Sequence, residues 1–234
     1  MVDIVETGGI LEKLDTTPLH ERVYQRLRRA IMAGLYPPGQ SFNFSQVAKE
    51  LGTSIMPVRE ALSRLEAEQA VEIMPKRGVT IPVMTPEKYA ELGRIRLKLE
   101  GMAAEMAAQA ISDATLDLLS SIVRDMAIMH QQAHRWQDYV LMNYEFHFAV
   151  YRAGTPQVLL PLIESLWLQS GPLLNIYKDV GIMENSRRHD NIVDALARKD
   201  ADGARRAVQT DLIAGFHYIS KAHGWSIDFK LDPP

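Results

Sequence analysis

Apolar and polar residues follow two different periods along the first third of the chain. Apolar side chains recur at the spacing of a helical face over 19–33, 43–50 and 54–69, and glycine-containing turns separate these stretches. The period then changes to two residues over 71–82, where a turn carrying two cations interrupts the run. The pattern therefore predicts three short helices followed by a β-hairpin with a basic tip.

Beyond residue 85 the apolar pattern is helical throughout. Breaks that contain glycine, proline or a Lys-Asp pair divide this part into the predicted helices 86–111, 113–133, 136–153, 155–169, 171–180, 183–198 and 201–222. No strand-like alternation interrupts them, so an antiparallel helical bundle is the expected arrangement. The pattern leaves open whether 171–180 is a helix or part of a loop.

Helix, turn, helix, glycine break, helix and basic hairpin in this order are typical of a winged helix-turn-helix. The expected fold class is mainly α: an N-terminal winged helix-turn-helix with a small β-hairpin wing, joined to an all-α antiparallel helical bundle. We expect a flexible arm over 1–16, a DNA-binding domain over 17–82, a linker over 83–86, a helical domain over 87–224 and a tail over 225–234.

Composition narrows the class of protein. Hydrophobic residues make up 47% and charged residues 24%, as in ordinary globular proteins, and no apolar run is long enough to predict a membrane span. The absence of cysteine excludes disulfides, thiolate metal sites and cysteine nucleophiles. With no secretion-signal pattern at the N-terminus, the expected location is the cytoplasm. A net charge of −3 argues against an indiscriminate polyanion binder, although 17–82 carries nine basic and only six acidic residues.

The third predicted helix has the composition of a DNA-recognition helix. Its first turns offer short polar, apolar and cationic side chains, of which Arg59 is best suited to a bidentate guanine contact or a phosphate. Arg28 on the first helix, with Lys76 and Arg77 on the hairpin, could neutralise backbone phosphates. The alternatives are that these are ordinary surface cations or that the three helices form a protein-interaction module.

The run Pro57-Val58-Arg59-Glu60-Ala61-Leu62 and its flanks resemble the DNA-binding domain of the GntR family over roughly 17–82. The resemblance implies a homodimer on a palindromic double-stranded DNA operator. Ile55 and Ser45 stand where the family commonly has basic residues, which favours apolar contact with thymine methyl groups over guanine contacts. The expected DNA-binding residues are Arg28, Ser54, Ile55, Met56, Arg59, Arg64, Lys76, Arg77 and Gly78.

Four polar side chains in the predicted bundle could enclose a divalent ion. Asn143 and His147 are four residues apart and share a helix face, His189 opens a later helix, and Asp211 lies on the helix after it. The alternative is that these histidines are surface residues or hydrogen-bonded core residues.

This region resembles the FCD domain of FadR-type GntR regulators over about 86–222. The segments that carry the resemblance are 96–100, 143–147, 188–190 and 204–212. It implies a metal ion beneath a small carboxylate effector, with ligands Asn143, His147, His189 and Asp211. Asn143 stands where the family usually has aspartate, and Asp211 where it usually has histidine. Such an oxygen-rich site would accept Zn, Ni, Mn or Fe.

Arg96 is the family-matched arginine on the first bundle helix, and its planar fork suits a carboxylate. The implied effector-binding residues are therefore Arg96, His147 and His189. The alternative for Arg96 is a salt bridge with Glu100, one turn further along the helix. A further set of residues is expected to pack in the core, namely Met102, Met106, Met126, Met129 and Trp136.

The function that these patterns favour is a DNA-binding transcriptional regulator, a repressor that a small organic acid controls, and not an enzyme. One alternative is a helical metal-dependent phosphohydrolase, because His147, His189-Asp190 and Asp211 match the residue order of such enzymes. Adjacent side chains on a helix diverge by about 100°, however, so His189 and Asp190 cannot both face one ion. A second alternative, a helical interaction protein that binds no DNA, does not explain the basic hairpin.

Overall fold

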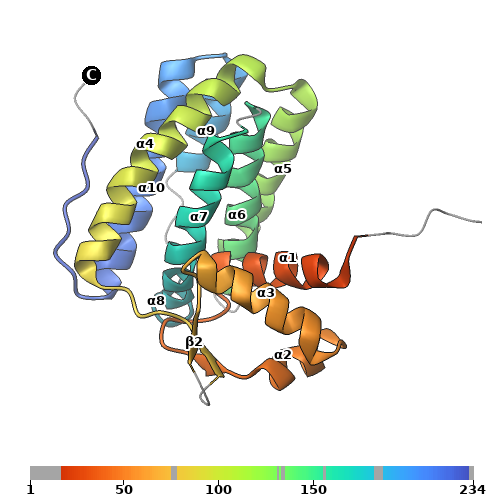
Figure 1. The fold of residues 1–234 in the computed structure, drawn as a ribbon. Helices are drawn as coiled ribbons and strands as arrows, with labels where there is room; N and C mark the ends of the chain where they lie inside the picture. The colour runs from red at the N-terminus through yellow and green to blue at the C-terminus, as the bar shows by residue number, and fades with distance from the viewer. Residues whose placement is uncertain are drawn as a thin grey trace, which may run out of the picture.

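The computed structural model describes residues 17–74, 78–130, 132, 135–154, 157–181 and 187–231. The predicted arm 1–16 and the hairpin tip with Lys76 and Arg77 lie outside this range. The chain forms a small N-terminal unit of three helices and a sheet, which lies beneath a larger bundle of helices (Figure 1). The expected fold class is confirmed.

The N-terminal unit consists of α1 (Leu19–Met32), β1 (Ser41–Phe42), α2 (Phe44–Leu51), α3 (Ile55–Ala67), β2 (Glu72–Met74) and β3 (Gly78–Thr80). Asn43 caps α2 by accepting a hydrogen bond from the backbone N–H of Gln46, and Gly52 ends it with a left-handed φ of 64°. The sheet has the antiparallel order β1-β3-β2. The sequence predicted only the β2–β3 hairpin, because a strand of two residues is too short to show a period.

The C-terminal unit consists of α4 (Pro86–Ala110), α5 (Asp113–His130), α6 (Trp136–Ala153), α7 (Leu159–Ser170), the 3-10 helix η2 (Gly171–Ile176), α8 (Tyr177–Val180), α9 (Arg188–Ala197) and α10 (Ala201–Ala222). Pro86, the last residue of the predicted linker and the first of the predicted helix 86–111, is the first residue of α4, where its missing N–H has no cost. The predicted helix 171–180 is a 3-10 helix followed by a single α-turn. No described helix is both long and apolar enough to cross a membrane.

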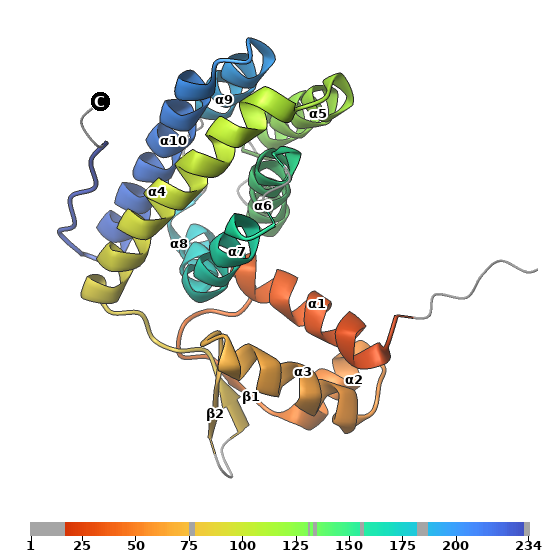
Figure 2. The ribbon, with the colours of Figure 1, turned by 45° about the horizontal axis from the view of Figure 1, so that its top comes forward.

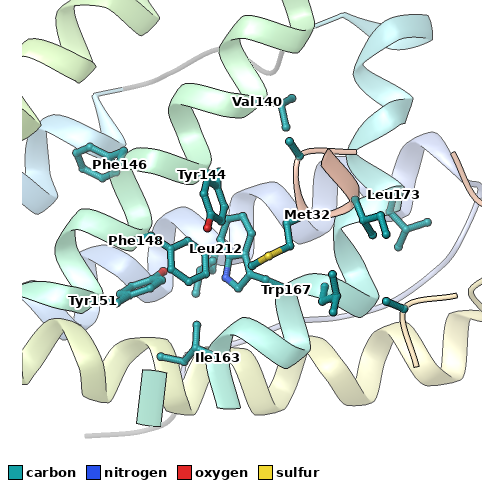
Figure 3. Close-up of a cluster of buried hydrophobic side chains, with 14 of the residues drawn as sticks. Met32, Val140, Tyr144, Phe146, Phe148, Tyr151, Ile163, Trp167, Leu173 and Leu212 are labelled. Carbon is teal, nitrogen blue, oxygen red and sulfur yellow. The ribbon is translucent and has the colours of Figure 1, made fainter. Parts of the chain in front are cut away.

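The bundle core is aromatic where α6 and α7 meet. Tyr144, Phe148, Tyr151 and Trp167 belong to one buried cluster, which Met32 at the end of α1 joins from the N-terminal unit (Figure 3). The two units therefore share a continuous core.

The methionines divide into two groups. Met126 and Met129 are buried, as expected. The expectation that Met102 and Met106 are core residues is wrong: their exposed fractions are 51% and 39%. Both lie on the face of α4 that points away from the bundle, because Ala103, Ala104 and Ala107 (all fully buried) occupy its inner face.

The seam between the two units is close-packed at the junction of α7 and η2. A Cβ on Gly171 would lie 2.6 Å from the backbone of Met32, so only glycine fits there. Asn175 donates a hydrogen bond to the carbonyl of Gly34. Arg28 forms an ion pair with Glu164 at 2.9 Å. The end of α1 is thus held directly against the bundle.

The segment after α10 turns back along the outside of α4 and α10 (Figure 2). Phe229 is buried against Gly93, where a Cβ would lie 2.3 Å from its ring. The backbone N–H of Phe229 donates to His217. Residues 225–231 of the predicted tail are therefore part of the packed structure.

Candidate functional site

The N-terminal end of α3 presents an exposed surface that combines polar, apolar and cationic groups. Ser54, Ile55, Met56 and Arg59 are all exposed, and Met56 has an exposed fraction of 61%. The guanidinium of Arg59 lies 4.7 Å from the ring centroid of Phe44, which orients it without enclosing it. This is the arrangement that a helix entering a DNA major groove requires.

Two of the expected DNA-binding arginines make contacts within the protein. Arg28 is half-buried and pairs with Glu164 across the seam, and its position favours a structural role. Arg64 lies 3.7 Å over the ring of Tyr24 and pairs with Glu21 at 2.8 Å. Gly78 begins β3 with a φ of 91°, and Lys76 and Arg77 lie outside the described residues.

A cavity of about 60 Å³ lies inside the bundle and brings together all five residues expected to bind metal and effector. Arg96 comes from α4, Asn143 and His147 from α6, His189 from α9 and Asp211 from α10. Aromatic side chains form much of the remaining wall, namely Tyr89, Tyr139, Trp167, Tyr177 and Phe216. A mainly apolar cavity with a few convergent polar groups is typical of a small-molecule site.

Three of these side chains have the geometry of a metal site. The ligand atoms of His147, His189 and Asp211 lie within 4.8 Å of one another, and all three residues are buried. Nε2 of His147 is 3.2 Å and Nε2 of His189 is 3.7 Å from Oδ2 of Asp211. Donors placed tetrahedrally at about 2.1 Å around one ion lie about 3.4 Å apart. The three atoms therefore fit a single ion, and Asn143 lines the same cavity.

The protonation states suit metal binding. Burial lowers the pKa of His189 to about 4, and the attraction of Asp211 offsets only part of this effect. Burial by itself would raise the pKa of Asp211, but His189, His147 and Arg188 together hold it below its usual value. At neutral pH, His189 is a neutral imidazole and Asp211 a carboxylate, which are the forms that bind metal.

Arg96 makes the salt bridge that the sequence left open as its alternative role. Its Nε donates to Oε1 of Glu100 at 2.6 Å, and its Nη1 donates to the hydroxyl of Ser170 at 3.0 Å. Its guanidinium carbon lies 4.4 Å over the ring of Trp167. Because Arg96 also lines the cavity, this contact does not remove it from reach of a ligand.

The sequence did not single out Tyr151, Trp167 or Ser170 as site residues. Tyr151 donates to Oε2 of Glu100 at 2.5 Å and lies 3.1 Å from Nδ1 of His147. Its position four residues after His147 was the only available signal, since it places both on one helix face. Ser170 is separated from Arg96 by 74 residues, and no local pattern could relate them.

Comparison with known proteins agrees with both halves of this architecture. The family model described as "Bacterial regulatory proteins, gntR family" matches residues 19–81, and the FCD domain model matches 91–214. The chain is 28% identical to the HTH-type transcriptional regulator McbR of Escherichia coli over 84% of its length and 90% of that protein. It is 30% identical to the Uxu operon regulator of Haemophilus influenzae, covering 81% of this chain and 77% of that one.

Solved structures give the same result. E. coli McbR/YncC superposes with a TM-score of 0.83 at 26% identity, over 88% of this chain and 99% of that one. A putative GntR regulator from Rhodococcus sp. RHA1 gives 0.67 at 25% identity, over 87% and 98%. The fold and the comparisons define a transcriptional regulator with a DNA-binding winged helix-turn-helix. The chain belongs to the GntR family, and its architecture is FadR-type with a C-terminal FCD domain.

Proposed function

We propose that this protein is a homodimeric repressor that binds a double-stranded DNA operator and is controlled by a small carboxylate bound in the cavity of the FCD domain. The observation that carries the proposal is the convergence of Arg96, His147, His189 and Asp211 on one buried cavity. A regulator of this kind works where the chromosome is, in the cytoplasm of a bacterial cell.

The cavity residues would make different contributions to binding such a ligand. His147, His189 and Asp211, with Asn143 beside them, would hold a divalent ion, which supplies positive charge for a carboxylate to coordinate. The charge of Arg96 is largely balanced by Glu100, so it orients an anion through its remaining N–H donors more than it attracts one. The aromatic wall selects for size and shape.

The position of the cavity supports control over the DNA-binding unit. Ser170, Gly171 and Leu174 line the cavity, and Gly171 and Leu174 also contact the end of α1 at Met32 and Gly34. If the position of this wall differs between two arrangements of the units, a ligand in the cavity binds one arrangement more tightly than the other. It then shifts the population between forms that bind DNA and forms that do not. Release of DNA upon ligand binding would then relieve the proposed repression.

Dimerisation through the FCD domain has a candidate surface. Ile95, Leu99, Met102 and Met106 form an apolar stripe along the outer face of α4, and Leu162 on the adjacent α7 is also exposed. Methionine-rich exposed stripes are uncommon on monomers and typical of interfaces.

We expect the variant Met102→Glu/Met106→Glu to sediment as a monomer at micromolar concentration, because two carboxylates would be buried without partners in the interface. The wild type should sediment as a dimer under the same conditions. Met56→Glu, which changes a methionine on α3 that is also exposed, is the matched control and should remain dimeric. A dimeric double variant would place the interface elsewhere.

The DNA-binding role of α3 predicts a large effect for Arg59→Ala. Loss of one bidentate contact should weaken operator binding about 5- to 150-fold, equivalent to roughly 1–3 kcal/mol. Binding is measured at fixed salt on a sequence selected with this protein from random DNA. Lys221→Ala, an exposed cation near the C-terminal end of α10 and outside the N-terminal unit, should bind as the wild type does. Unchanged affinity of Arg59→Ala would contradict the assigned role.

We infer that the cavity binds its ligand without catalysis. The phosphohydrolase alternative needs His189 and Asp190 on one ion, and the cluster of ligand atoms in the described residues contains His189 but not Asp190. The regulatory names of the relatives agree with this inference.

A further inference from the structure

A continuous chain of buried polar contacts joins the candidate metal ligands to Arg96. Asp211 contacts His147, His147 contacts Tyr151, Tyr151 binds Glu100, and Glu100 pairs with Arg96. Glu100 and Tyr151 are fully buried, and neither belongs to the ligand cluster. The positions of these two side chains determine where the hydrogen atoms lie in this series of contacts.

The direction of each hydrogen bond follows from the donors available. Glu100 is paired with Arg96 and is therefore a carboxylate, which can only accept. Tyr151 has one hydrogen to donate, and its distance of 2.5 Å to Oε2 of Glu100 is that of a charge-assisted bond.

In the contact between Tyr151 and His147, Tyr151 must therefore be the acceptor and His147 the donor. Once the Tyr151 hydroxyl hydrogen points to Glu100, the phenol oxygen can only accept, and Nδ1 of His147 is the donor at 3.1 Å. A neutral imidazole with its hydrogen on Nδ1 has a bare lone pair on Nε2. That lone pair faces Oδ2 of Asp211 at 3.2 Å, a distance that either a proton or a metal ion between the two atoms can bridge.

We propose that Tyr151 is a positioning residue for the metal site: held by Glu100 and Arg96, it accepts a hydrogen bond from Nδ1 of His147 and so presents Nε2 as a metal donor beside Asp211. The inference rests on the proposed metal site and adds a partner that orients one of its ligands. It also connects the metal to Arg96, the residue proposed to hold the effector's carboxylate. Binding of either one is then linked reciprocally to binding of the other.

The test is the Zn²⁺ affinity of the full-length Tyr151→Phe protein, measured by competition with a chromophoric chelator. Loss of an outer hydrogen-bond partner should weaken Zn²⁺ binding by roughly 10- to 100-fold. Tyr24→Phe is the matched control, because Tyr24 is also buried and donates to a glutamate, Glu68, at 2.6 Å, but lies in the N-terminal unit. Its Zn²⁺ affinity should equal that of the wild type. An unchanged affinity in Tyr151→Phe would overturn the proposal.

A second measurement separates this inference from the proposed metal site itself. Nitrogen-15 spectra of the histidine rings in metal-free wild type should show a hydrogen on Nδ1 of His147, and that signal should shift in Tyr151→Phe but not in Tyr24→Phe. A wild type that binds no Zn²⁺ yet has this hydrogen would refute the metal site and leave the hydrogen-bonded chain intact. If Nδ1 of His147 carries no hydrogen, the proposed series of hydrogen bonds from Arg96 to His147 is wrong, whether or not the protein binds metal.

Discussion

Replacing Arg96 by methionine is expected to lower the free energy of unfolding by about 3–5 kcal/mol, because it leaves the carboxylate of Glu100 buried without its cation. Glu100 has no exposed surface, and its ion pair with Arg96 measures 2.6 Å. Methionine fills a similar volume beside Trp167, so most of the loss comes from the uncompensated charge and little from a cavity. Chemical denaturation of metal-free protein, at one fixed protein concentration, measures the effect.

Two further variants test this explanation. Arg96→Met/Glu100→Gln removes both charges and keeps an acceptor for Tyr151, so it should recover most of the lost stability. Arg206→Met breaks an ion pair with Asp202 in which both side chains are about half exposed, and it should cost less than about 1 kcal/mol. If Arg96→Met is as mild as Arg206→Met, the pair with Glu100 is not the buried structural element described above.

The purified protein is expected to hold about one equivalent of a transition metal per chain and to lose it in His147→Ala/His189→Ala. Removing two of three buried ligands should weaken binding by more than about 100-fold, since losing an outer partner alone costs roughly 10- to 100-fold. In the wild type, Zn²⁺ at 100 times its dissociation constant should raise the free energy of unfolding by about 2.7 kcal/mol. The double variant should gain nothing from the same addition.

The control for this pair is His20→Ala/His223→Ala, which also removes two imidazoles but leaves the cavity unchanged. It should bind Zn²⁺ as the wild type does. A wild type that is folded but binds no transition metal would mean that Asn143 and Asp211 do not complete a site with the two histidines. The ligand search would then centre on Arg96 and the aromatic wall.

The helices of this protein could be predicted because they depend on neighbouring residues. Asn43 and Gly52 mark the two ends of α2 through their own backbone geometry, which needs nothing from the rest of the fold. The resemblance of residues 57–62 to the GntR family could also be identified from sequence, because a recognition helix contacts DNA through residues that are close together along the chain. The candidate ligands His147 and His189 were identifiable because few side chain types bind metal.

Contacts between distant residues could not be predicted in the same way. Arg28 has the sequence pattern of a phosphate-binding residue, yet its partner is Glu164, 136 residues away. Met102 and Met106 are as apolar as their buried counterparts, and only the packing of α4 against the bundle decides that they face outward. A periodic pattern defines a helix face but not the element that covers it.

The sequence by itself determined the order of the main helices, the recognition helix and the identity of the groups that could bind metal and anion, because backbone hydrogen bonding and side-chain chemistry are local properties. The tertiary structure decided that α4, α6, α9 and α10 bring those groups to one cavity, that Tyr151 and Glu100 join His147 to Arg96, and that Gly171 places the cavity wall against α1. These relations depend on which helix faces pack together, and the packing of the whole core determines which faces those are.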